Sequence, residues 1–249
     1  MRAFWTLVRR ELGGHFFSWT GYVVIAAVLF LIGLCFHILI ADLNAHPSDQ
    51  PLTEVFYQTV WVILWIAAPV ITMRAFAQEK YSGTFETLMT APVSDLQVVL
   101  AKFTGAMIFY FLTWLPLTGC LAIIGHLGHD PGILDPPIVV STYIGVLLLG
   151  SVYMALGCFA SSITRNQIIA AIITLAGGIA LFLLNRLSSG FASKVGWQTQ
   201  LFSYLNLLEH MQDFTRGVID TRPLVLYLSS TFFLLFLTFR VVESRRWKP

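Results

Sequence analysis

The chain has 249 residues, of which 57% are hydrophobic and only 11% are charged. A soluble protein of this size could not bury so much apolar surface, so the composition predicts an integral membrane protein. The formal net charge is only +2 and the chain has no long basic tract, which argues against a nucleic-acid partner.

Residues 1–17 predict an amphipathic helix that lies along a membrane surface. Apolar side chains share one helical arc, namely Phe4, Trp5, Val8, Leu12 and Phe16. Arginines occupy the opposite arc, namely Arg2, Arg9 and Arg10. There they can meet anionic lipid head groups. A simple positive flank to the first membrane span is the alternative interpretation.

Six apolar segments then approach the length of about 20 residues that a helix needs to cross a bilayer. They cover residues 19–40, 57–77, 96–125, 138–163, 168–184 and 223–242. The first is too long for the core of a cleavable signal peptide, which favours a membrane span. Small residues recur at helical spacing in the fourth and fifth segments, namely Ser151, Ala155, Ala170, Thr174 and Gly178. We therefore expect one all-α domain, residues 1–249, with closely packed helices.

The connection between the second and third segments carries the clearest turn and cap signals. Gly83 tolerates a positive φ, and Thr84 can cap a short helix with Glu86 in its first turn. The helix would have an apolar face of three side chains, namely Phe85, Leu88 and Met89. Pro92 would end it. An ordinary loop with two good caps is the alternative interpretation.

Beyond that loop, Ser94 and Gln97 form a sequence signature of a capping box that opens the third segment.

The distribution of Lys and Arg predicts the orientation in the membrane. If both termini face the cytoplasm, the basic residues outside are confined to one long connection, namely Arg186, Lys194, Arg216 and Arg222. This asymmetry matches the usual excess of positive charge on the inner side. The connection after residue 77 then lies on the cytoplasmic side.

The long connection before the last segment contains a second amphipathic helix. Asn206 and Glu209 form a cap-like pair, and residues 209–216 predict a helix that Gly217 can terminate. Under the predicted orientation, this helix lies on the outer side of the membrane.

Several other functions lack the residues that their chemistry requires. His126 and His129 are flanked by Gly and Pro in a predicted loop, and no cysteine or carboxylate cluster completes a metal site. Ser188 and Ser189 have no neighbouring His, which argues against a hydrolase triad. No polar catalytic constellation occurs inside or near the spans, which argues against a membrane enzyme. The spans lack central charged residues, which argues against an ion-driven carrier. No P-loop motif occurs, so this chain cannot bind ATP through one.

The three cysteines, Cys35, Cys120 and Cys158, all fall inside apolar runs, which favours buried side chains over a disulfide framework.

The run Glu79-Lys80-x-x-Gly83-Thr84-Phe85-Glu86-x-Leu88-Met89-Thr90-x-Pro92-Val93-Ser94 resembles the segment after the second span in permeases of type 2 ABC exporters. In that family the segment forms the coupling helix that docks on the ATPase subunit. The resemblance implies the same role for the residues that match, namely Glu79, Lys80, Gly83, Thr84, Phe85, Glu86, Leu88, Met89 and Pro92.

The run from Tyr204 to Asp220 and the ending Glu243-Ser244-Arg245-Arg246-Trp247 are similar to permeases related to gliding-motility and copper-maturation exporters. There the first run forms re-entrant or interfacial helices on the outer side. The resemblance implies an outer gate formed by Asn206, Glu209, Asp213, Phe214 and Gly217. An amphipathic hairpin that caps the bundle without touching substrate is the alternative.

Together these resemblances imply a permease subunit of an ABC exporter in a bacterial inner membrane. The distribution of Lys and Arg predicts that both of its termini lie in the cytoplasm. ATP and Mg would bind to a separate ATPase subunit, so this chain would carry neither a catalytic site nor a cofactor. A second permease, identical or homologous, and membrane lipids would be its other partners. The alternative function is mechanical or assembly work driven by the same ATPase, without transport of a substrate.

Overall fold

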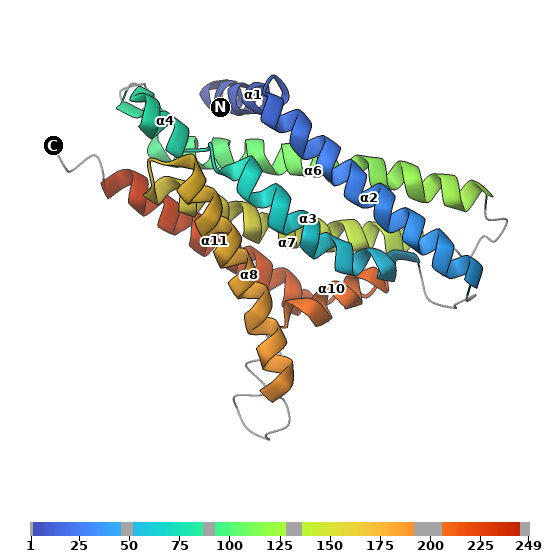
Figure 1. Cartoon of the computed structure of the whole chain (residues 1–249). Helices are drawn as coiled ribbons and strands as arrows, with labels where there is room; N and C mark the ends of the chain where they lie inside the picture. Colours follow the sequence, from blue (N-terminus) through green and yellow to red (C-terminus); the bar gives the residue numbers. More distant parts are fainter. Residues whose placement is uncertain (1, 46–51, 87–92, 128–135, 192–205, 245–249) are drawn as a thin grey trace.

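The computed structural model describes residues 2–45, 52–86, 93–127, 136–191 and 206–244. These residues form helices joined by turns, and no strand occurs among them, so the all-helical class is confirmed there (Figure 1). The helices are α1 (Arg2–Phe16), α2 (Trp19–Ala45), α3 (Leu52–Thr72), α4 (Ala77–Ser82), α6 (Asp95–Leu127), α7 (Pro136–Ile163), α8 (Gln167–Phe191), α10 (Leu207–Thr215) and α11 (Thr221–Ser244).

Five stretches of the described residues are long and apolar enough to cross a membrane. They belong to α2, to α3 together with α4, and to α6, α7 and α11. The remaining expected span, residues 168–184, lies in α8, whose described apolar stretch, Gln167–Leu183, is shorter than the other five. A multi-pass membrane protein is therefore supported, and the total of six spans stays a prediction.

Several helices extend beyond the expected spans, because hydropathy marks the bilayer core rather than the ends of a helix. The second apolar segment does not run unbroken over 57–77: α3 begins at Leu52 and ends at Thr72, and α4 follows after a turn. Helix α6 continues to Leu127, so the backbone at His126 is helical instead of forming a loop.

The helix before the last span is likewise α10, residues 207–215, which lies one or two residues earlier than the expected 209–216.

Helix α7 lies at the centre of the bundle and contacts α3, α4, α6, α8, α10 and α11. The close packing expected from its small residues is confirmed, because Ser151 and Ala155 on α7 are buried. Ala170, Thr174 and Gly178 on α8 are buried as well. The hydroxyl of Tyr153 donates a hydrogen bond of 3.0 Å to the carbonyl of Gly178, which joins α7 to α8.

Helix α1 confirms the expected N-terminal helix and packs against α6. Val8 is buried, but Trp5 is 61% exposed, so the expected apolar arc is only partly covered by the protein. An exposed aromatic side chain beside exposed arginines is typical of a helix at a membrane interface. The interfacial position itself stays a prediction.

The bundle has two distinct ends. Figure 1 shows α1, α4 and the last turns of α11 at one end, and α10 toward the other. Helix α7 connects them: Ser161 contacts the turn before α4, and Gly145 lies against Phe214 of α10. We call these the α4 end and the α10 end.

Candidate functional site

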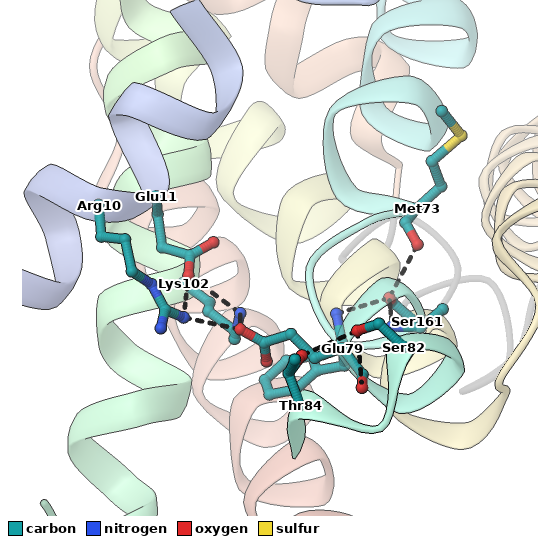
Figure 2. A network of polar contacts seen from close by, with 10 residues as sticks. Arg10, Glu11, Met73, Glu79, Ser82, Thr84, Lys102 and Ser161 are labelled. Carbon is teal, nitrogen blue, oxygen red and sulfur yellow. Dashed lines mark hydrogen bonds and ion pairs between the residues drawn. The ribbon is translucent and has the colours of Figure 1, made fainter. Parts of the chain in front are cut away.

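The turn between α3 and α4 is fixed by one buried serine of α7. The hydroxyl oxygen of Ser161 accepts hydrogen bonds of 3.0 Å from the backbone N–H groups of Phe76 and Ala77. The same hydroxyl donates a bond of 3.1 Å to the carbonyl of Met73 (Figure 2). These bonds replace the partners that the backbone would have in a continuous helix. The side chain of Ser161 therefore explains why the second span breaks at this point.

Lys80 ties α4 to the C-terminal end of α7. Its ammonium donates a hydrogen bond to the carbonyl of Ser162, one of the last carbonyls of α7, and its side chain is buried. A cation at a helix C-terminus is stabilised by the helix dipole and satisfies an open carbonyl. The Nζ atom also lies 5.4 Å from the centre of the Phe85 ring. Lys80 thus acts inside the protein and does not face solvent.

Glu79, on the same helix, belongs to a cluster of four charged side chains from α1, α4 and α6, which Figure 2 shows. Its Oε1 atom lies 2.7 Å from Nη2 of Arg10 and 3.0 Å from Nζ of Lys102. The Oε1 atom of Glu11 lies 3.0 Å from both of these nitrogen atoms. We call Arg10, Glu11, Glu79 and Lys102 the charge cluster. Its two cations and two carboxylates join three helices that are far apart in sequence.

The charge cluster is largely shielded from solvent. The side chain of Lys102 is only 3% exposed. Burial alone would raise the pKa of Glu11, but Lys102 and Arg10 outweigh it and lower that pKa below its ordinary value. Glu11 is therefore charged at neutral pH. Ion pairs shielded in this way interact more strongly than pairs on an exposed surface.

The structure describes only some of the residues that the sequence assigns to the coupling segment after α4. Gly83 has the expected positive φ, 74°, but a helix ends there and not near Gln78. Residues 84–86 are helical. Thr84 is exposed and its hydroxyl lies 2.8 Å from that of Ser82, while Glu86 is also exposed. The remaining expected residues, Leu88, Met89 and Pro92, lie outside the described residues.

The expectation that Phe85 presents an apolar face to a partner was wrong. Its side chain is only 8% exposed and belongs to an internal cluster that includes Phe76, Val98 and Val99. Amphipathic periodicity shows that a face is apolar, but it cannot show whether the protein itself covers that face. The exposed aromatic residue in this region is Tyr81, at 81%, which the sequence motif did not include.

The capping box that opens α6 is confirmed. The backbone N–H of Gln97 donates to Oγ of Ser94 at 3.3 Å, and that of Ser94 donates to Oε1 of Gln97 at 3.2 Å. The two reciprocal bonds satisfy donors that would otherwise be open at the start of the helix. Ser94 therefore defines the start of α6.

A cavity of about 750 Å³ adjoins the charge cluster. The walls come from α1, α2, α3, α4 and α6. Its polar lining includes the charge cluster together with His15, Ser18 and Arg74.

At the α10 end, the cap predictions are confirmed. The side-chain oxygen of Asn206 accepts a hydrogen bond of 3.5 Å from the N–H of Glu209, and Gly217 has a φ of 84°. The carbonyl of Asp213 accepts bonds from Arg216 and Val218 in the same turn.

Phe214 is buried against Gly145, so α10 packs onto the bundle through this ring. Helix α10 is therefore packed against the protein. Its role as an outer gate remains a prediction.

Replacing Ser161 with alanine should lower the stability of the α4 end. The change leaves two buried N–H donors and one carbonyl without their partner, which costs about 1–3 kcal/mol. The thermal midpoint of the purified protein in detergent measures the loss. Ser162→Ala is the matched control, because this neighbouring buried hydroxyl bonds, among the described residues, only to the carbonyl of Phe159 in its own helix. Equal midpoints for the two variants would show that Ser161 does not fix the turn.

Comparison with protein families adds independent support for the sequence resemblance. The model of the family described as ABC-2 family transporter protein matches residues 17–181, about two thirds of the chain. No curated protein matches the chain. The matched region includes α4, the charge cluster apart from Arg10 and Glu11, and the capping box of α6. The chain therefore belongs to the ABC-2 family of transporter membrane proteins.

Proposed function

We propose that this chain is the membrane-spanning permease subunit of an ABC exporter in a bacterial inner membrane, driven by ATP hydrolysis on a separate subunit. The family match carries this proposal, because permeases of this kind work with an ABC ATPase. The clustering of cap signals, buried charges and exposed side chains around α4 supports a coupling role for residues 79–92.

The contacts of α4 suggest how a force on this segment would spread. Lys80 joins α4 to the end of α7, and Glu79 joins it to α1 and α6 through the charge cluster. A helix keeps its hydrogen bonds internally satisfied in lipid, so it moves as a rigid element. A displacement of α4 would therefore be passed to three helices together, while Tyr81, Thr84 and Glu86 face outward for a partner.

The proposed topology places the α4 end and both termini in the cytoplasm and the α10 end outside. The positions of α1, α4 and the end of α11 at one end of the bundle support it (Figure 1). A second copy of this chain or a homologous permease would complete the transport path. The similarity to gliding-motility and copper-maturation permeases stays part of the proposal. Mechanical work without transport gains no support from the family match.

Replacing Glu86 with lysine tests the coupling role. The side chain is exposed, and reversing a charge in a first helical turn costs only about 0.3–1 kcal/mol, so the variant should fold normally. The expected result is loss of co-purification with the ABC ATPase from native membranes and loss of permease-stimulated ATP hydrolysis. Glu209→Lys is the matched control, since Glu209 is an exposed first-turn residue of α10. If Glu86→Lys retained the ATPase as well as Glu209→Lys does, this segment would not be the coupling element.

A further inference from the structure

The lining of the cavity beside the charge cluster contains both polar and apolar residues. Polar residues of the lining include Ser18, Thr20 and Arg74. Apolar residues of the lining include Val24, Val70 and Phe109. Two residues of the same lining are large and strongly exposed aromatics, Phe17 at 92% and Trp19 at 89%. Exposed aromatic side chains next to apolar helices are typical of the level of lipid head groups in a membrane.

The charges of the lining do not balance. The charge cluster contributes two cations and two carboxylates, which pair with one another. Arg74 adds a further positive charge, and it has no carboxylate within ion-pair distance among the described residues. Its Nη1 atom donates to Oγ of Ser18 at 2.7 Å. Its Nε atom is buried and has no hydrogen-bond partner in the described part of the protein.

The first turn of α2 reinforces this positive character. Trp19, Thr20 and Gly21 line the cavity at the point where α2 begins. The N-terminus of a helix carries a partial positive charge, which favours an anion. The N–H of Gly21 is already bonded to the carbonyl of Ser18 at 3.0 Å. The hydroxyls of Ser18 and Thr20 lie 2.7 Å apart beside Arg74 and add polar atoms to the same wall. Arg74 and the start of α2 thus line the same cavity.

We propose that this cavity binds the phosphate group of a membrane phospholipid, held by the guanidinium of Arg74. A guanidinium binds phosphate through charge-assisted N–H donors, and Arg74 lines the cavity without a carboxylate partner among the described residues. The apolar residues of the lining and the exposed Phe17 and Trp19 suit the acyl chains of the same lipid. Binding here would go beyond the coupling function and does not depend on it, because every residue of the site lies in this chain.

Chemical modification of the wild-type protein tests the site without any substitution. The purified chain in detergent is treated with phenylglyoxal, an arginine-selective reagent, with and without phosphatidylglycerol, and each arginine is quantified by mass spectrometry. Phosphatidylglycerol at about ten times its dissociation constant should slow the modification of Arg74 about tenfold, because only the lipid-free site reacts. Arg240, which is exposed and paired with Glu243, is the internal control and should react equally in both samples. Equal modification of Arg74 with and without lipid would overturn the proposal.

Two further arms identify the source of the phosphate and the role of Arg74. Inorganic phosphate at the same concentration should give no protection, and protection by it alone would mean a free-anion site instead of a lipid site.

Thr20→Glu keeps Arg74 in place but sets a carboxylate beside it, so phosphatidylglycerol binding measured by native mass spectrometry should weaken about tenfold. Binding unchanged in Thr20→Glu would also contradict the proposal. Because the ATPase is absent throughout, these results are independent of the coupling test.

Discussion

Replacing Lys102 with methionine is expected to lower the free energy of unfolding by about 3–5 kcal/mol, the usual cost of removing one partner of a buried ion pair. Methionine has a similar length, so the loss would arise from charge and not from packing. It would leave Glu11 and Glu79 with Arg10 as their only cation among the described residues. For a protein of this size, the thermal midpoint in detergent should fall by about 6–20 °C.

Two comparisons separate this effect from a general cost of losing a positive charge. Arg240→Met removes a cation from an exposed pair with Glu243, and it should change stability by less than about 1 kcal/mol. Combining Lys102→Met with Glu79→Gln should restore part of the lost stability, since the cluster again has equal numbers of cations and carboxylates. If Lys102→Met and Arg240→Met had the same thermal midpoint, the charge cluster would not stabilise the contact between α1, α4 and α6.

Replacing Gly157 with leucine should prevent α3 and α7 from packing. A Cβ atom at this position would approach Thr72 Cβ to 2.6 Å and Cγ2 to 2.9 Å, and would collide with Oγ1 as well. Thr72 cannot turn away easily, because it is branched next to the backbone and its hydroxyl donates to the carbonyl of Ala68. Overpacking usually costs about 1–3 kcal/mol, and a clash with atoms this close to the backbone should reach or exceed the upper value.

Gly33→Leu is the matched control for this substitution. Gly33 is also a helical glycine, in α2, but no atom lies within 4 Å of the position that its Cβ would take. The leucine there should leave the size-exclusion profile and the thermal midpoint unchanged, whereas Gly157→Leu should give aggregated or strongly destabilised protein. Similar profiles for both variants would mean that α3 and α7 do not approach closely at Gly157.

The features that could be predicted from the sequence are those determined by residues near one another in the chain. Gly83 and Gly217 both adopt a positive φ where a helix ends, and Ser94 with Gln97 forms the expected capping box. A cap depends on a side chain and a backbone group only a few residues apart, so its signal is fully present in a short sequence. The apolar helices were identifiable for the same reason, although their ends were not.

The features that could not be predicted depend on contacts between distant segments. The break before α4 depends on Ser161, which lies 85 positions after Phe76. The partners of Glu79 come from α1 and α6, and nothing in the motif around Glu79 indicates them. Phe85 illustrates the same point, since its burial depends on Val98, Val99 and the other residues that surround it in the folded protein.

Site-specific photo-crosslinking at Tyr81 tests the central claim most directly, because this side chain is 81% exposed at the end of α4. In one variant a photoreactive amino acid replaces Tyr81. In the other it replaces Ile219, which follows α10 and is 50% exposed. Both variants are expressed in the native membrane together with the ABC ATPase and irradiated. The account predicts a crosslink to the ATPase from position 81 and none from position 219. A crosslink from position 219, or none from position 81 in a complex that retains its ATPase, would contradict it.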